Sequence, residues 1–184
     1  MALPIEGGQW SLDPAHSAIE FAVRHLGIST VRGRFTEAAA TLVVGEALDS
    51  SSLSAEIQMA SVSTGNTDRD GHLQSTDIFN VETQPTMSFQ SSSITETGSG
   101  AYRVSGDMTI NGRTNTESFD ATFFGTETFP MDGSTRAGFE ATGQIDKTDY
   151  GIDFNVPLTE GGFMLSDKID VTIHAQLVAP AGDG

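Results

Sequence analysis

The residues best suited to chemistry lie close together in the segment Arg69-Asp70-Gly71-His72-Leu73. The carboxylate of Asp70 and the imidazole of His72 could form a pair, and with Arg69 they could hold an anionic or hydroxylated group. The same residue types also serve a structural purpose, in which Asp or Thr caps a short helix and Arg pairs with an acid. The residues alone leave both interpretations open.

The rest of the sequence offers little for catalysis or metal binding. None of the four histidines (His16, His25, His72 and His174) has the spacing of a zinc site such as H-E-x-x-H. The absence of cysteine excludes disulfides, thiolate catalysis and cysteine-ligated metals. Neither a G-x-S-x-G elbow nor a phosphate-binding loop is present. We therefore predict no catalytic residue, no metal site and no resident cofactor, and we expect that the protein is not an enzyme.

The composition is that of an acidic chain. Nine Lys and Arg residues oppose 25 Asp and Glu residues, which gives a formal net charge of −16. Because so few cations cannot form a basic face, nucleic acid is excluded as a general partner and an anionic membrane is disfavoured. No run of apolar residues approaches the length of a membrane span, so an integral membrane protein is not expected. Met1–Gln9 lacks a signal-peptide pattern, which predicts a cytoplasmic protein, or a secreted one if a leader has been removed.

An alternation of apolar and polar residues runs through most of the chain and predicts half-buried strands. It recurs in the segments 16–25, 31–35, 38–44, 53–59, 87–89, 102–110, 119–123, 139–145 and 169–177. The alternation changes phase at Thr36–Glu37, which predicts a bulge, and Asn111-Gly112 predicts a two-residue hairpin turn. Helical structure is expected only where the alternation fails, at Asp68–Glu82 and Asp146–Leu158.

Eight or nine antiparallel strands must form a sandwich or close into a barrel, because an open sheet leaves unpaired edges. The length fits a single domain spanning 1–184. Small residues on the inward faces would leave room for a ligand, and the candidates are Gly33, Ala40, Ala55, Gly106, Ala121, Ala141, Gly143 and Ala175. In the alternative, small and large residues interlock in a filled core, and the pattern does not decide between the two.

A succession of motifs gives the chain a family resemblance. The motifs follow one another as Trp10-x-Leu12-Asp13-x-x-His16-Ser17, Arg69-Asp70-x-His72-Leu73, Gly106-Asp107-Met108-Thr109-Ile110-Asn111-Gly112 and Asp149-Tyr150-Gly151-Ile152. Together they resemble the YceI-like family of lipocalin-like polyisoprenoid-binding proteins. The similarity runs from Trp10 to Leu177 and implies one YceI-like domain with a core of about 10–178. Two positions depart from the family pattern: Lys147 stands where Arg is frequent, and Asn115 where a basic residue is usual.

The resemblance implies an all-β fold, an extended eight-stranded antiparallel lipocalin-like barrel with a short helical segment. It further implies a long apolar tunnel that holds an isoprenoid chain, such as a polyprenyl chain or a quinone tail, and a tendency to form homodimers. The polar head group of the lipid is expected at Asp70 and His72, with Arg69 beside them. The residues expected to line the tail cavity are Ile19, Phe21, Val23, His25, Phe35, Ile57, Met59, Phe89, Phe139, Ile173 and Leu177.

Three functions are compatible with these expectations. The first is a carrier or store of an isoprenoid or quinone-like lipid, since burial contributes ~0.8 kcal/mol per CH₂ and needs no charged clamp. The second is an enzyme acting on a hydrophobic substrate, with His25 or His72 and Asp70 as acid–base groups. The third is a filled, ligand-free barrel that serves as a stress or interaction protein. Because a net charge of −16 repels a diphosphate, a neutral head group deserves at least equal weight in the first function.

Overall fold

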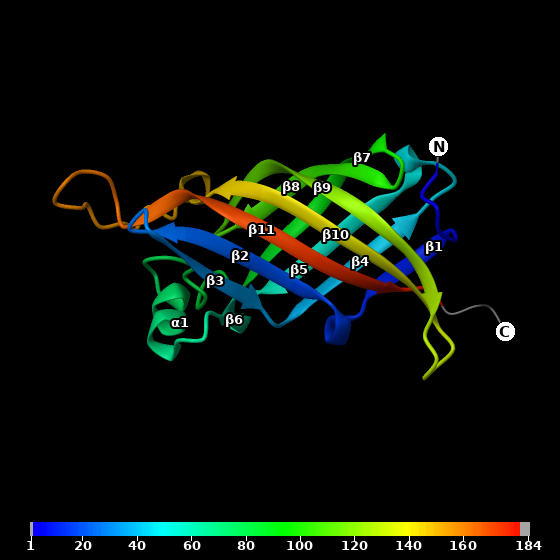
Figure 1. The fold of residues 1–184 in the computed structure, drawn as a ribbon, viewed down its shortest axis with the longest axis horizontal. Coiled ribbons are helices and arrows are strands. Elements are labelled where there is room, and N and C mark those ends of the chain that lie inside the picture. The colour runs from blue at the N-terminus through cyan, green and yellow to red at the C-terminus, as the bar shows by residue number, and fades with distance from the viewer. Residues whose placement is uncertain (1, 181–184) are drawn as a thin grey trace.

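The computed structural model describes residues 2–180 and consists mainly of β-strands (Figure 1). All the strands belong to one antiparallel sheet: β1 (Gly8–Leu12), β2 (Ala18–His25), β3 (Ser29–Phe35), β4 (Ala38–Val44), β5 (Ser52–Gln58), β6 (Val62–Ser63), β7 (Thr86–Gly98), β8 (Ala101–Ile110), β9 (Arg113–Thr128), β10 (Thr135–Asp146) and β11 (Leu165–Val178).

Eight of these strands close into a barrel. The ring runs β1-β4-β5-β7-β8-β9-β10-β11 and closes where β1 pairs with the end of β11, with Leu12 opposite Leu177. Three further strands lengthen one wall, because β2 pairs with β11 beyond β1, β3 pairs with β2, and β6 pairs with β3. The prediction of an extended eight-stranded antiparallel barrel is therefore confirmed.

The strands of this longer wall are broken where the sequence changes phase. β3 ends at Phe35 and β4 begins at Ala38, so the irregularity predicted at Thr36–Glu37 is present. The 3₁₀ turn η1 (Pro14–His16) separates β1 from β2, and η3 (Met59–Ser61) separates β5 from β6. Two of the breaks lie side by side, because the Thr36 N–H donates to the Ser61 carbonyl at 3.2 Å. The breaks divide the closed ring from its extension.

The hairpin predicted at Asn111-Gly112 joins β8 to β9. Asn111 has φ of 53° and Gly112 has φ of 73°. A type I′ turn requires positive φ at both central residues, and Asn and Gly tolerate that conformation better than other residues. Ile110 and Arg113 pair directly across the turn, so the two residues fix the register of both strands.

Helical structure appears in both predicted segments, as α1 (Thr67–Gln74) and the 3₁₀ turn η4 (Lys147–Tyr150). α1 begins after Asn66, whose side chain accepts a hydrogen bond from the Arg69 N–H at 2.9 Å. The expectation that helix occurs nowhere else was wrong, because η1, η2 (Leu48–Ser50) and η3 are additional 3₁₀ turns. Each is three residues long, which is too short to show an apolar period.

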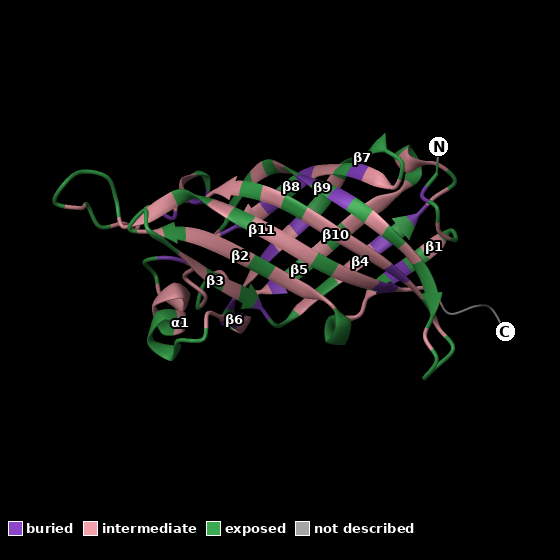
Figure 2. Cartoon of the chain, viewed as in Figure 1, coloured by how far each residue is buried: buried purple, intermediate pink, exposed green. Residues whose placement is uncertain are grey.

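Buried residues, purple in Figure 2, occur along the length of the barrel. Their side chains form two apolar clusters. One cluster contains Trp10, Tyr102 and Leu177, together with Leu3 from the N-terminal segment. The other contains Phe35, Phe89 and Tyr150, among others, and lies toward the extended end, where Leu73 of α1 packs against it. Ala141, Leu53 and Val104 contact both clusters, so the two are joined through the middle of the barrel.

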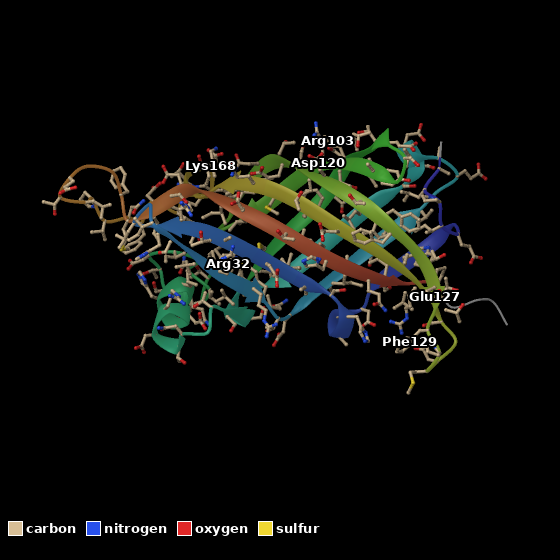
Figure 3. The ribbon with its side chains drawn as sticks, in the orientation of Figure 1. Arg32, Arg103, Asp120, Glu127, Phe129 and Lys168 are labelled. Carbon is tan, nitrogen blue, oxygen red and sulfur yellow. The ribbon has the colours of Figure 1, made fainter. Side chains whose placement is uncertain are left out.

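An ion-pair network at the end of the barrel opposite α1 fastens η1 to the β9–β10 hairpin. The guanidinium of Arg136 bonds to the carboxylate of Asp13 and lies 2.9 Å from that of Asp132. It also stacks 4.6 Å from the ring centre of Phe129, which is labelled in Figure 3. Chiefly because His16 bonds to the carboxylate at 2.8 Å, the pKa of Asp13 is lowered below its ordinary value. The Asp of the opening sequence motif is therefore a structural residue.

Replacing Arg136 with Ala is expected to lower the free energy of unfolding by about 1.5–3 kcal/mol, the scale of hydrogen bonds to charged groups. Arg103→Ala is the matched control. Arg103 pairs with Asp120 at 2.8 Å on the exposed outer surface (Figure 3), so this substitution should lower the free energy of unfolding by less than about 1 kcal/mol.

Asp13→Asn tests the pH dependence of the same network. Because the folded pKa of Asp13 is depressed, its contribution is complete above the unfolded pKa and disappears as pH falls through the folded value. Urea unfolding at neutral and acidic pH measures both effects; equal losses for Arg136→Ala and Arg103→Ala would contradict the assignment.

Candidate ligand-binding cavity

An apolar cavity of about 290 Å³ lies inside the barrel and is lined by residues of both buried clusters. Its volume is at the lower end of the roughly 300–1,000 Å³ that small-molecule sites occupy. Ten of the residues expected to line a tail cavity do line it, namely Ile19, Phe21, Val23, Phe35, Ile57, Met59, Phe89, Phe139, Ile173 and Leu177. His25 is not among its lining residues. A filled core, the alternative left open by the sequence, is not what the structure contains.

Alanines provide much of the space. Ala40 and Ala55 face each other across β4 and β5, and Ala121 and Ala141 face each other across β9 and β10. In the closed ring, β4 and β5 stand opposite β9 and β10. All four alanines line the cavity, so the two alanine pairs belong to opposite walls.

The glycines expected to widen the cavity do something else. A Cβ on Gly33 would lie 2.3 Å from the ring of Phe21, and a Cβ on Gly143 would lie 2.6 Å from the ring of Phe119. A Cβ on Gly106 would lie 2.3 Å from the carbonyl oxygen of Gln90. These three glycines are not cavity-lining residues, because the space beside each is filled by a neighbouring strand.

A buried ammonium group lies at the cavity wall. Lys147 is 6% exposed, and among the residues that the structure describes it is the one charged residue that is buried. Its Nζ donates to the carbonyl oxygens of Ile152 and Phe154 at 3.0 and 3.4 Å, and it lies 3.3 Å from the carboxylate of Asp167. These partners satisfy the charge, as burial of an ammonium group demands. The Lys147 side chain therefore fixes the loop after η4 over the barrel.

Tyr150 anchors the same loop to the barrel wall through a hydrogen bond to β9. Its side chain is fully buried, and its hydroxyl donates to the Glu117 carboxylate at 2.7 Å. Burial, reinforced by the hydrogen bond to Glu117, raises the pKa of Tyr150 well above the ordinary tyrosine value. Asn115 adds a hydrogen bond from its amide nitrogen to the Asp149 carbonyl at 3.0 Å. Both positions that depart from the family pattern, Lys147 and Asn115, thus serve the segment that covers this end of the cavity.

The structure does not bring Asp70 and His72 together. Asp70 accepts hydrogen bonds from the N–H and the hydroxyl of Thr64 at 2.8 and 2.6 Å, and Arg69 donates to the same hydroxyl at 2.7 Å. The imidazole of His72 lies 3.3 Å from the carboxylate of Asp77. None of the three predicted head-group residues lines the cavity. The contacts of Asp70 and Arg69 are those of residues that hold α1 to the preceding segment.

His72 does not line the cavity but contacts Phe154, which does. Its ring meets the ring of Phe154 edge to face, with centroids 4.7 Å apart, and Phe154 lines the cavity. His25, the other histidine considered for chemistry, occupies the last position of β2 and pairs with Leu165 and Ser29. Within residues 2–180, no group of three or more His, Cys, Asp or Glu side chains is arranged to hold a metal ion.

Replacing Asp70 with Asn is expected to lower the melting temperature, because Thr64 loses an ionised acceptor worth about 1.5–3 kcal/mol. Binding of geranylgeraniol, which has a hydroxyl head, and of squalene, a bare hydrocarbon, should weaken equally. Thermal unfolding and two ligand titrations make the comparison, and His72→Ala is measured alongside. A selective loss of geranylgeraniol binding at unchanged stability would instead assign head-group recognition to these residues.

Sequence reasoning missed Lys147 and Tyr150 as lining residues. The available signal was a single lysine and a Tyr-Gly pair inside a long segment without strand alternation. Ile78 and Phe79, in the connection between α1 and β7, also line the cavity.

No helix in the described part of the chain is both long enough and apolar enough to cross a membrane.

An eight-stranded antiparallel barrel with an apolar internal cavity places this protein in the class of lipocalin-like barrels. The sequence profile of the YceI-like domain matches residues 10–177, and the chain belongs to the YceI-like family. A UPF0312 protein of Staphylococcus aureus strain N315 is 39% identical over 169 residues, which are 91% of this chain and 95% of that protein.

Solved structures share the fold. BcnA of Burkholderia cenocepacia superposes with a TM-score of 0.76 at 22% identity, over 92% of this chain and 99% of that one. A polyisoprenoid-binding domain from Saccharophagus degradans, implicated in plant cell wall breakdown, superposes with a TM-score of 0.67 at 15% identity, over 93% of this chain and 98% of that one.

Proposed function

We propose that this protein binds a long isoprenoid-type lipid, such as a polyprenyl chain or a quinone tail, in the barrel cavity and serves as its carrier or store. The observation that carries the proposal is the apolar cavity between two alanine-lined walls. Membership of the YceI-like family supports it, as does the shared fold with a domain that binds polyisoprenoids.

The tail supplies most of the affinity in this proposal. Burial of apolar surface contributes ~0.8 kcal/mol per CH₂, whereas the candidate head-group residues already have protein partners. A neutral head group fits better than a diphosphate, because the chain carries a formal net charge of −16. The head would lie near α1, where His72 and Phe154 meet and where Lys147 approaches the cavity.

The cavity volume limits how much of a tail the barrel holds without rearrangement. About 290 Å³ is small for a long polyprenyl chain, so a long ligand must extend out of the barrel or displace flexible side chains. Met59, Met87 and Met108 all line the cavity, and methionine adapts its shape more readily than branched residues. Affinity should therefore grow with chain length only until the cavity is full.

Titration with geraniol, farnesol, geranylgeraniol and solanesol tests the proposal. Each added isoprene unit that enters the cavity should tighten binding at least about tenfold, and solanesol should gain little over the length that fills the cavity. Affinity independent of chain length would contradict binding in the cavity. Mass spectrometry of the recovered lipid completes the test, because a carrier returns its ligand unchanged, whereas a product that accumulates with time would establish an enzyme.

A further inference from the structure

Two loops at one end of the molecule form an exposed apolar surface, here called the tip. The first is the β2–β3 turn with Leu26 and Ile28, and the second is the segment 155–165, which projects furthest beyond the barrel in Figure 1. Seven large apolar side chains are exposed in the described chain, and four of them belong to the tip: Leu26, Ile28, Val156 and Phe163. Ile28 is 83% exposed and Phe163 is 60% exposed, so the patch lies open to solvent.

Hydrogen bonds tie the two loops of the tip together next to the cavity wall. The Leu26 N–H donates to the Met164 carbonyl at 2.7 Å, which ties the two loops together. Asn155 bonds to the Leu165 backbone through both its amide nitrogen and its amide oxygen, at 2.8 and 2.9 Å, and closes the base of the second loop. Leu165 and Phe154 line the cavity, so the exposed apolar surface adjoins the binding site.

The sequence of the tip works against the local stability of its turn. Leu26 has φ of 54° and Gly27 has φ of 70°, nearly the φ values of Asn111 and Gly112, although this connection has three residues, Leu26–Ile28, between the paired His25 and Ser29. Asn suits this conformation, whereas a leucine at positive φ is strained. An apolar side chain therefore stands where the turn itself favours a polar one.

The tip is also poor in charge. Glu160 is the one charged residue in segments 26–30 and 155–165, and Arg24 borders the first loop, where its guanidinium donates to the Gly27 carbonyl at 3.4 Å. Four partly exposed side chains present at most a few hundred Å², because even an aromatic side chain contributes roughly 150–250 Å². A stable protein interface needs roughly 800 Å² per partner, so the patch is small for a dimer.

We propose that the tip contacts the surface of a zwitterionic phospholipid bilayer and brings the end of the cavity lined by Phe154 and Leu165 to the membrane. Apolar side chains at an interface enter the boundary between head groups and acyl chains, and a surface with few charges meets little electrostatic resistance from a zwitterionic bilayer. Such a contact would let a lipid tail pass between the bilayer and the cavity without crossing water, and this part of the inference rests on the proposed function. The membrane contact does not depend on whether the cavity binds a lipid.

Flotation with phosphatidylcholine vesicles tests the contact in the full chain. The wild type should float with the vesicles, and Ile28→Asp and Phe163→Asp should each lower the bound fraction at least about tenfold. Met131→Asp is the matched control, because Met131 is 82% exposed in the β9–β10 hairpin at the opposite end and should leave flotation unchanged. Leu26→Asn should weaken flotation and raise the melting temperature, since it relieves the turn. Anionic phosphatidylglycerol in the vesicles should weaken flotation.

The outcomes separate this inference from the proposed function. Titration with farnesol in the absence of vesicles should give wild-type affinity for both tip variants. Vesicle flotation equal in wild type and tip variants would overturn the inference even if farnesol binds. Flotation that depends on the tip in a protein that binds no isoprenoid would retain the contact and refute the carrier. A dimer that the tip variants dissociate, with no flotation of the wild type, would overturn the membrane contact in favour of a second copy of the chain.

Discussion

Replacing Ala55 with Trp is expected to block isoprenoid binding while the barrel remains folded. Ala55 lines the cavity from β5, opposite the wall that carries Ala141. The cavity has a volume of about 290 Å³, and an indole at position 55 would fill part of the space that a tail must enter. We expect the affinity for geranylgeraniol to fall at least about a hundredfold, equivalent to about 3 kcal/mol. Ala141→Trp, from the opposite wall, should have the same effect.

The matched controls lie one residue away on the same strands. Ser54 and Thr142 are exposed neighbours of Ala55 and Ala141, and side chains of successive strand residues point to opposite faces. Ser54→Trp and Thr142→Trp should therefore bind geranylgeraniol like the wild type. Circular dichroism and thermal unfolding establish that the inward variants are folded. If both inward variants unfold, the cavity offers no spare volume; if both bind normally, the ligand occupies another place.

Loss of the Tyr150 side chain is expected to have the largest effect on stability. Tyr150→Ala removes a fully buried aromatic ring beneath the η4 loop and should cost about 3–5 kcal/mol, a large part of the stability of a typical domain. Tyr150→Phe keeps the ring, removes only the hydrogen bond to Glu117, and should cost about 1.5–3 kcal/mol. Chemical denaturation of the three proteins measures the two contributions separately.

The same residue makes a prediction at alkaline pH. The folded pKa of Tyr150 is raised, so its contribution to stability is complete below the unfolded pKa of about 10 and decreases as pH rises above it. Tyr150 alone makes the free energy of unfolding fall by about 1.4 kcal/mol per pH unit in that range. Burial also raises the pKa of Tyr102, the only other tyrosine. Tyr150→Phe should therefore show a shallower alkaline slope; an unchanged slope would contradict the assignment.

The barrel could be predicted because alternation along a strand fixes which side chains share a face. Ile19, Phe21 and Val23 line the cavity for this reason, and the Asn111-Gly112 hairpin follows from the conformations that these two residues tolerate. The same argument was wrong for His25. That residue shares the phase of Val23, but it is the last residue of β2, and its strand partner Leu165 lines the cavity whereas His25 does not.

The candidate head-group site was less predictable, because closeness in sequence does not determine where side chains point on a helix. Residues two positions apart on a helix point to different sides, so Asp70 turns to Thr64 while His72 turns to Asp77 and Phe154. Lys147 and Tyr150 become cavity residues only through tertiary contacts with Asp167 and Glu117. Such contacts leave no periodic trace in the sequence.

The central claim, an isoprenoid lipid held in the cavity, is tested most directly by extracting the freshly purified protein with organic solvent and identifying the extract by mass spectrometry. The protein is purified without detergent, and wild type, Ser54→Trp and Ala55→Trp are extracted in parallel. We predict an intact isoprenoid or prenylquinone from the wild type and from Ser54→Trp, in near-equimolar amount, and none from folded Ala55→Trp. Equal recovery from all three proteins, or no isoprenoid from the wild type even after incubation with prenyl lipids, would contradict the account.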